Sequence, residues 1–367
     1  MGRTILFLFA LVIFSVTPSH GQATKCGKLF ERKEWRTLTQ EEKSGWVGAV
    51  KCLGSIRHQR LSFTPEQTVL EGMRSLYDDF SYSHAAVEHS AHRNVYFLPW
   101  RMFRLLSTFV QHFYIDTCAD RWFLYLFDAS LRQNCGYSGP TPYWDWSRDH
   151  ADLVGSSVFE DSPEFGLGGT GDCSSSPEAD CKVTTGAFAQ FELAWPIPHP
   201  LRRNLTLITG WFDHEKPQNS TLGPDSVRNS TEHHTGDFYS FQHSMEQMHN
   251  HVHNFVGGDL AGDCPKKLPA DDCKDLAVAF TPNDPLFWLH HAQLDRLWSK
   301  WQRRHPANFA AFSGIPFHSF NMSDPQYDVK ASADYEMPFD VQSVPVTPRQ
   351  VFDTEAGPLC YQYLDDE

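Results

Sequence analysis

The spacing of hydrophobic residues along the chain predicts a series of amphipathic helices. Thr39-Gln40-Glu41-Glu42 has the form of a capping box, and it precedes apolar residues at helical spacing: Trp46, Val47, Val50 and Leu53. A second such run starts at Phe63-Thr64-Pro65-Glu66 and continues through Val69, Met73, Leu76 and Tyr77. Two longer runs, 238–255 and 285–304, show the same period. These patterns predict a mainly α fold.

The segments between these runs are long and rich in turn-forming residues. Gly, Ser, Pro and Asp dominate residues 155–186, which predicts a long loop, and residues 136–146 are expected to lead from a helix end into another loop. From Met337 onward, prolines and β-branched residues predict short strands that end near Tyr361-Gln362-Tyr363. There is no internal repeat. We therefore expect one mainly α domain over residues 22–367.

The first 21 residues have the pattern of a secretory signal peptide. Arg3 provides the positive start, Ile5–Val16 the apolar stretch, and Ser19-His20-Gly21 a small-residue exit. About twelve apolar residues are too few for a spanning helix. Four glycosylation sequons, at Asn204, Asn219, Asn229 and Asn321, agree with secretion. We expect an extracellular protein that has no membrane association after signal cleavage.

Charge and cysteine content narrow the picture further. The formal net charge of −14 argues against nucleic acid as a partner, because nucleic-acid binding needs a basic surface. Nine cysteines leave one unpaired in an oxidising compartment. Cys173 with Cys181 and Cys264 with Cys273 are close enough in sequence to close short loops, and these are the disulfide candidates. The full pairing and the oligomeric state stay open.

Two histidine-bearing segments carry the candidate chemistry. His249 and His253 are four residues apart, so a helix presents both imidazoles on one face. About forty residues later, Asn283-Asp284-Pro285 precedes an amphipathic run that contains His290 and His291. Imidazoles that converge from two helices suit Zn, Cu, Fe or Ni. A zinc hydrolase is disfavoured, because position 250, where such a site needs a glutamate, is asparagine.

These segments resemble the tyrosinase and catechol oxidase (polyphenol oxidase) family of type-3 binuclear copper enzymes, in a short secreted fungal-type form. The resemblance rests on His249-Asn250-x-x-His253 with Val256-Gly257-Gly258, and on Asp284-Pro285-x-Phe287-x-x-His290-His291-x-x-x-Asp295-Arg296-x-Trp298. It implies a four-helix bundle around two copper ions, with long disulfide-tied loops. It also implies that His249, His253 and His291 hold one copper, whereas His290 points elsewhere, about 100° around the helix.

The resemblance implies a second copper on the segment from His84 to Trp100. His84 and His92 match the first two ligands, and Phe97-Leu98-Pro99-Trp100 matches the family motif that precedes the third. The next residue is Arg101, which cannot bind copper. His89 and His112 are the alternative ligands if the chain is read as printed.

We interpret residues 101–120 as an insert that derives from a retained intron. Replacing Arg101–Asp120 by one histidine gives Trp-His-Arg-Trp-Phe-Leu, the expected continuation of the motif, and removes Cys118, the odd cysteine. The possible codons permit a splice donor at Arg101 and an acceptor at Asp120 whose joining restores a histidine codon. The other interpretation is a genuine insertion in a chain with an impaired first copper site.

The resemblance assigns roles to three further residues. Asn250 matches an asparagine that helps hold an activating water, and Phe287 matches an aromatic residue over the substrate entrance, although a core phenylalanine has the same pattern. Asp295 matches a carboxylate that orients the metal ligands, although a helix salt bridge is also compatible with its position. The acidic partner for the water has no clear match; Glu246 is a candidate with different spacing.

The implied activity is oxidation of small phenolic substrates with O₂ as co-substrate. O-diphenols give o-quinones, and the missing acidic partner favours diphenol oxidation over hydroxylation of monophenols. Two alternatives remain: a catalytically impaired secreted glycoprotein with this fold, supported by Arg101, and a haemocyanin-like oxygen binder. A single copy of the domain favours an enzyme over the oxygen binder.

Overall fold

The computed structural model describes residues 25–57, 74–91, 120–174, 176, 179–207, 218–273, 277–314, 331–339 and 342–364. Its helices are α1 (Gln40–Ser55), α2 (Leu76–Ala91), α3 (Asp120–Cys135), α4 (Gln218–Thr221), α5 (Pro224–His233), α6 (Phe238–Val256), α7 (Gly258–Ala261), α8 (Ala270–Cys273), α9 (Leu286–Arg304) and α10 (Pro306–Phe309). Its strands are β1 (Phe30–Arg32), β2 (Glu192–Leu193), β3 (His199–Pro200) and β4 (Tyr361–Tyr363). The predicted mainly α class is confirmed.

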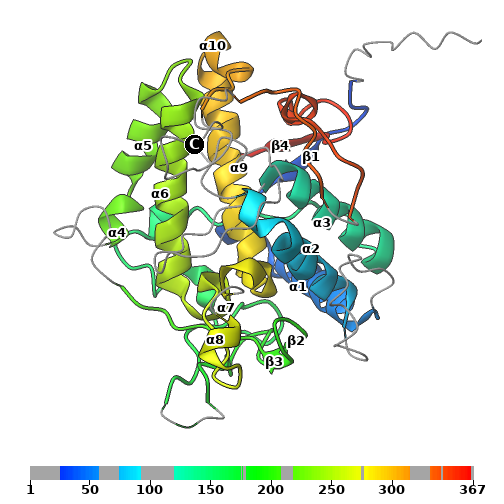
Figure 1. Ribbon diagram of the computed structural model, residues 1–367, viewed down its shortest axis with the longest axis vertical. Helices are drawn as coiled ribbons and strands as arrows, with labels where there is room; N and C mark the ends of the chain where they lie inside the picture. Colours follow the sequence, from blue (N-terminus) through cyan, green and yellow to red (C-terminus); the bar gives the residue numbers. More distant parts are fainter. Residues whose placement is uncertain are drawn as a thin grey trace, which may run out of the picture.

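Helix α9 lies at the centre of the molecule. Helices α5 and α6 pack on one side of it and α3 on the other, with α1 and α2 beyond (Figure 1). The start of α9 is fixed by Asp284, whose carboxylate accepts hydrogen bonds from the backbone N–H of Leu286 at 2.8 Å and from Arg203 at 2.6 Å. Bidentate pairing with arginine gives this anchor a defined orientation.

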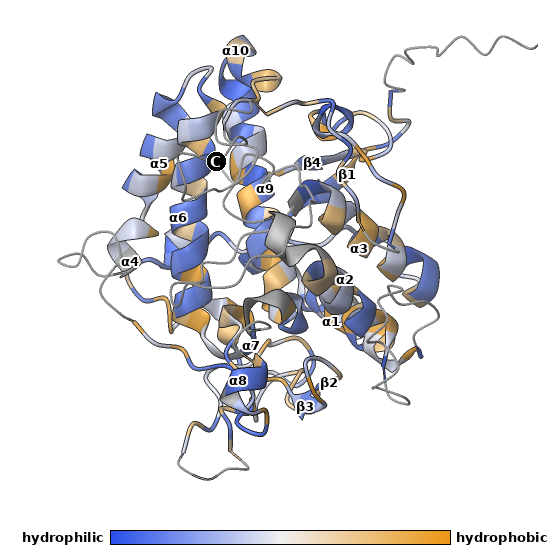
Figure 2. Cartoon of the chain, viewed as in Figure 1, coloured by the Kyte–Doolittle hydropathy of each residue, from blue (hydrophilic) through white to orange (hydrophobic). Residues whose placement is uncertain are grey.

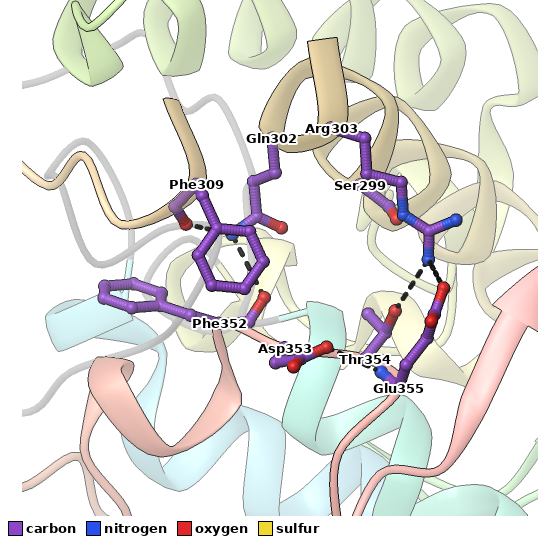
Figure 3. Close-up of a pocket in the computed structure, with 8 residues that line it drawn as sticks. All are labelled: Ser299, Gln302, Arg303, Phe309, Phe352, Asp353, Thr354 and Glu355. Atoms are coloured by element: carbon purple, nitrogen blue, oxygen red, sulfur yellow. Dashed lines mark hydrogen bonds and ion pairs between the residues drawn. The ribbon is translucent and has the colours of Figure 1, made fainter. Parts of the chain in front are cut away.

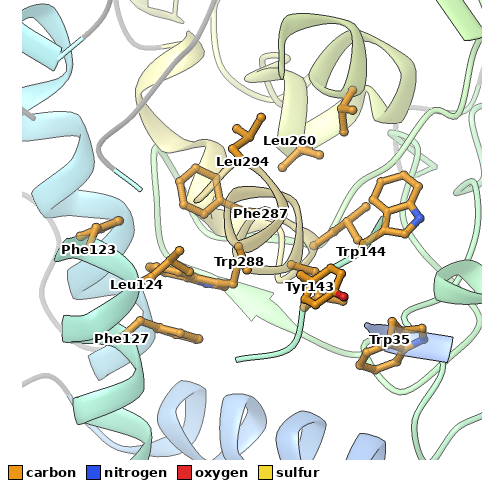
Figure 4. Close-up of a cluster of buried hydrophobic side chains, with 14 of the residues drawn as sticks. Trp35, Phe123, Leu124, Phe127, Tyr143, Trp144, Leu260, Phe287, Trp288 and Leu294 are labelled. Carbon is orange, nitrogen blue, oxygen red and sulfur yellow. The ribbon is translucent and has the colours of Figure 1, made fainter. Parts of the chain in front are cut away.

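Aromatic side chains fill the space between α2, α3 and α9. The Trp288 indole of α9 stacks on Phe127 of α3, with ring centroids 3.7 Å apart (Figure 4). Phe80 of α2 meets Trp288 edge-on at 5.5 Å. Large aromatic rings bury much apolar area and pack with defined geometry.

In Figure 2 the visible side of α6 is mostly hydrophilic, as expected for a helix whose apolar residues face inward.

Helix α1 begins as the sequence predicts. The Thr39 side chain accepts a hydrogen bond from the Glu42 backbone, and the Glu42 carboxylate accepts one from the Thr39 backbone, which completes the capping box. Helices α6 and α9 also match the predicted ranges within a residue. The expected helix start at Phe63 lies outside the described residues, as do the proposed signal peptide and residues 101–119.

Two small pairings and four disulfides complete the described structure. Strand β1 pairs in parallel with β4, in the register Phe30↔Tyr361, and β2 pairs antiparallel with β3. Both predicted disulfides, Cys173–Cys181 and Cys264–Cys273, are present. Two unpredicted ones, Cys26–Cys360 and Cys52–Cys135, are formed as well. All eight cysteines of the described part are therefore paired, and Cys118 lies outside it.

The exposure of the sequon asparagines and the character of the helices bear on the expectations about secretion and membranes. Asn204 and Asn229 are exposed, whereas Asn321 and the side chain of Asn219 lie outside the described part of the chain. Among the residues described, no helix combines the length and apolar character needed to cross a bilayer.

Candidate metal centre

Helices α6 and α9 bring four buried imidazoles together. His249 and His253 come from α6, and His290 and His291 come from α9. One ring nitrogen of each lies within 4.8 Å of those of the other three. Each of the four residues is at most 3% exposed. An all-nitrogen donor set of this kind fits copper, zinc, iron or nickel.

In the two α6 histidines, one ring nitrogen is fixed by a neighbouring polar atom. The Leu260 carbonyl lies 2.5 Å from Nδ1 of His253, and the Asn250 side-chain oxygen lies 3.0 Å from Nδ1 of His249. A neutral imidazole that donates from Nδ1 presents the lone pair of Nε2. Contacts of this type orient metal-binding histidines in proteins.

Two glycines bring Leu260 back toward the end of α6. Gly257 and Gly258 have φ values of +63° and +54°, which side chains other than glycine rarely adopt. A Cβ atom on Gly258 would also lie 2.3 Å from the Arg202 carbonyl oxygen. The Val256-Gly257-Gly258 segment thus reverses the chain, and α7 then places the Leu260 carbonyl beside His253.

Burial favours the uncharged form of the His249 and His290 imidazoles. Burial, followed by the nearby imidazoles of His253, His291 and His290, holds the pKa of His249 well below its ordinary value of 6.5. The pKa of His290 is also well below 6.5, again because of burial first and His253 second. Since only a neutral imidazole can bind a metal ion, these two side chains are ready for metal binding at neutral pH.

The expectation that His290 points away from the site is wrong. The His290 ring lies 5.1 Å from that of His249 and 5.3 Å from that of His253, and His291 lies 5.1 Å from His249. The 100° step between neighbours on α9 does not separate the two rings, because the α6 histidines lie over the strip between them. The helical angle alone missed this crossing geometry.

The other half of the predicted copper pair is only partly described. His84 is buried on α2, and it is not a member of the group of four. Its ring meets Phe287 edge-on at 5.7 Å, and Phe287 stacks on His291 at 3.8 Å, so this phenylalanine lies between the two histidines. His92 lies outside the described residues. His84 and His92 therefore stay predictions as ligands.

Phe287 and Asn250 occupy positions that bear on the predicted roles. Phe287 is 1% exposed and packs in the aromatic core, so it has the packing role that its pattern allowed; its role at a substrate entrance stays a prediction. The Asn250 oxygen is directed at His249. Glu246 accepts a hydrogen bond from Gln242 at 3.2 Å, and within the group of four described ligands there is no carboxylate.

Asp295 contacts other partners than the sequence suggested. Its carboxylate accepts hydrogen bonds from Arg121 at 2.6 Å and from the hydroxyl groups of Tyr361 and Tyr363. No histidine is among the partners identified in the described residues. Direct orientation of the metal ligands by Asp295 is therefore not observed here. The carboxylate instead joins α9 to α3 and β4, and it reaches the site only through the placement of these elements.

One cavity in the described part lies away from the histidines. It has a volume of about 300 Å³ and is lined by Ser299, Gln302, Arg303, Phe309, Phe352, Asp353, Thr354 and Glu355 (Figure 3). These residues begin eight positions after His291, roughly 12 Å along α9. Its lining includes an Arg303–Glu355 ion pair at 2.6 Å and no histidine. We do not assign the chemistry to this cavity.

The fold and the histidine group define a helical-bundle protein with an all-imidazole candidate metal site. Residues 120–304, from the first residue of α3 to the last of α9, match the common central domain of tyrosinase. This match covers half of the chain. The chain therefore belongs to the tyrosinase family, and it is an oxidoreductase of the tyrosinase and polyphenol oxidase type.

Individual relatives agree with this assignment. A tyrosinase of Aspergillus flavus is 29% identical over 375 residues, which cover 99% of this chain and 88% of the relative. A tyrosinase of Streptomyces glaucescens is 31% identical over 306 residues, covering 78% of this chain and 87% of the relative. The structure of a polyphenol oxidase variant from Thermothelomyces thermophila superposes with a TM-score of 0.67 at 26% identity, covering 92% and 89%.

Proposed function

We propose that this chain is a copper-dependent oxidase that converts o-diphenols to o-quinones, with diphenol oxidation favoured over hydroxylation of monophenols. The observation that carries the proposal is the buried imidazole group of α6 and α9 within a tyrosinase-family fold. Two diphenol molecules give four electrons and four protons, which reduce one O₂ to two water molecules. His249, His253 and His291 hold one copper in this proposal, and His84 and His92 belong to the other.

When bound, a type-3 copper pair supplies O₂ binding and electron transfer. The residues of this chain provide the surroundings that this chemistry needs. The Leu260 carbonyl and the Asn250 amide fix two imidazoles, so little reorganisation is needed when metal binds. All ligands are neutral, so the metal charge is retained and favours an approaching phenolate. Among the described residues, no Asp or Glu belongs to the set of converging ligand atoms, which is in line with the preference for diphenols.

We also propose that residues 101–120 interrupt the first copper site and that the functional chain has one histidine in their place. Arg121 supports this: it follows the proposed junction and is buried at the start of α3, bound to Asp295. The family match starts at residue 120, the last residue of the interruption. The pairing of all eight cysteines in the described part adds support, because removal of the insert also removes Cys118.

Secretion is part of the proposal. The apolar start of the sequence, the sequons and the four disulfides all support an oxidising, extracellular destination. Asn204 and Asn229 are exposed, as glycan attachment requires.

The test compares the chain as printed with a chain in which Arg101–Asp120 is replaced by one histidine. Copper content and O₂ consumption with catechol are measured for both. We expect two copper ions and quinone formation for the second chain. For the printed chain we expect one copper and catechol oxidation lower by at least about a hundredfold, since the loss of a catalytic group typically costs that much.

His249→Ala in the second chain supplies the internal test of the site. It should lose copper from the α6–α9 half and lose catechol oxidation. His243→Ala is the matched control, because His243 lies on the same helix but is exposed and outside the group of four. Equal catechol oxidation by the printed chain and by the chain with the histidine replacement would contradict the insert proposal. Copper binding without any quinone formation in either chain would favour the impaired glycoprotein instead.

A further inference from the structure

The Leu260 carbonyl that contacts His253 belongs to a very short helix. Helix α7 spans only Gly258–Ala261, and its Leu260 carbonyl lies 2.5 Å from Nδ1 of His253. A single helical turn has little stability of its own, because the cost of starting a helix is not recovered over so few residues. The position of this carbonyl therefore depends on contacts that hold α7 from outside the helix.

A buried carboxylate on α7 makes such contacts. Asp259 is 3% exposed, and its Oδ2 accepts a hydrogen bond from the backbone N–H of Arg202 at 2.8 Å. Its Oδ1 accepts one from Nη2 of Arg202 at 2.7 Å and lies 3.0 Å from Nε2 of His199. The Asp259 N–H in turn donates to the Arg202 carbonyl at 3.0 Å. Side-chain and backbone contacts thus join α7 to the segment that begins at β3.

This segment is itself well anchored. The Leu201 N–H donates to the Phe191 carbonyl at 2.9 Å, and the Arg203 N–H donates to the carbonyl of the disulfide-bonded Cys181 at 3.0 Å. Backbone bonds on both sides of Arg202 leave it little freedom to move. Arg202 therefore gives α7 a fixed point of attachment.

We propose that Asp259 is a positioning residue for His253: it holds α7 against Arg202, so that the Leu260 carbonyl fixes the His253 imidazole within the group of four. The inference rests on the proposed function, in which His253 is a copper ligand, and it assigns what orients that ligand. Burial alone would raise the pKa of Asp259, but the charges of His199 and Arg202 outweigh it and hold the pKa below its ordinary value of 3.8. The side chain is therefore a carboxylate at neutral pH, and it can accept all of these hydrogen bonds.

His249, the other α6 ligand, is held in a different way. Its Nδ1 lies 3.0 Å from the side-chain oxygen of Asn250, which belongs to α6 itself. Loss of the Asp259 contacts should therefore release His253 and leave His249 unchanged. The ordinary alternative is a buried ion pair that only stabilises the fold, and its loss would disturb both imidazoles or neither.

Nuclear magnetic resonance of the apoprotein distinguishes the two alternatives. The printed chain and its Asp259→Asn variant carry isotope-labelled histidine, and the Nδ1–H signals of His253 and His249 are followed in both. We expect the variant to lose the hydrogen-bonded His253 signal and to keep that of His249. A competition titration should show copper binding weakened by at least about tenfold, because loss of a residue that orients a metal ligand typically costs that much.

Asp128→Asn is the matched control. Asp128 is also buried and pairs with an arginine, Arg32, at 2.7 Å, but it lies on α3. Its substitution removes a carboxylate from a buried ion pair, as Asp259→Asn does. We expect it to lower stability and to leave both the His253 signal and the copper affinity unchanged.

An unchanged His253 signal in folded Asp259→Asn, or equal changes at His249 and His253, would overturn the inference. If Asp259→Asn does not fold, His199→Gln takes its place, because it removes one partner of Asp259 and keeps the pairing with Arg202. The same selective change at His253 is then expected. A printed chain that binds no copper would overturn the proposed function, whereas the signals of the apoprotein do not depend on copper, so the two failures are distinguishable.

Discussion

At the scale of single residues, the chain places polar atoms so that buried histidines take defined protonation states. His253 and His249 each have one acceptor at Nδ1, and burial holds the pKa of His249 well below its ordinary value. His199 is the opposite case: its Nδ1 lies 2.6 Å from the Ile197 carbonyl and its Nε2 lies 3.0 Å from the Asp259 carboxylate. Two acceptors on one ring require two N–H donors, which only the protonated imidazole has.

This geometry predicts a pH-dependent contribution of His199 to stability. Burial lowers the pKa of His199, but the Asp259 charge and the two hydrogen bonds outweigh burial and raise it above 6.5. The stabilisation is thus complete below the unfolded-state pKa and is lost as the pH rises through the higher folded-state pKa. His199→Gln removes this dependence. Urea unfolding from about pH 6 to about pH 8 should show the stability difference between wild type and variant shrinking with pH; a difference that grows with pH would contradict it.

The sequence revealed residue identity more readily than residue contacts. The spacing of His249 and His253 and the apolar pattern around them predicted their shared face. The inward position of His290 depends on how α6 crosses α9, and the Leu260 carbonyl is a backbone atom that any residue type would provide. The glycines after Val256 were the available signal for the contact between the Leu260 carbonyl and His253, because a tight reversal brings the following backbone toward the helix end.

At the scale of elements, a buried charge network joins α3, α9 and β4. Arg121 donates to Asp295 at 2.6 Å and to the Val351 and Phe352 carbonyls, both at 2.9 Å, and its guanidinium lies 3.7 Å from the centroid of the Trp298 ring. The sequence predicted the helices themselves, because their periodicity is local. It did not predict that Asp295 pairs with Arg121, since the two residues are 174 positions apart.

Asp295→Asn tests this network. The substitution leaves the Arg121 guanidinium buried without its carboxylate, which typically costs about 3–5 kcal/mol. Urea unfolding at constant copper content measures the loss. Asp334→Asn is the control, because Asp334 pairs with Arg349 at 2.6 Å on the exposed surface, where ion pairs contribute little. If the two substitutions were equally mild, the network would not be what holds α3 and β4 against α9.

At the scale of the whole molecule, the two ends of the described chain are fastened together beside this network. Cys26–Cys360 lies next to the β1–β4 pairing, and β4 carries both tyrosines that bind Asp295. The cysteine count predicted that disulfides form, and short spacing predicted two of them. The pairing of Cys26 with Cys360 was not predictable, because spacing says nothing about cysteines 334 residues apart.

Loss of the end-to-end disulfide should therefore be more costly than loss of a short one. A bond that closes a loop of 334 residues restricts the unfolded chain more than one that closes 8, by about 3 kcal/mol from chain entropy alone. We expect Cys26→Ser with Cys360→Ser to lower the free energy of unfolding by more than Cys173→Ser with Cys181→Ser. Removal of the Cys26–Cys360 bond should also weaken the Asp295 network, because β4 is then held only by its strand pairing and side-chain contacts. Urea unfolding of both double variants, followed by tryptophan fluorescence, measures the difference. A greater loss of unfolding free energy on removal of the Cys173–Cys181 bond would show that local loop order, rather than closure of the whole chain, dominates stability.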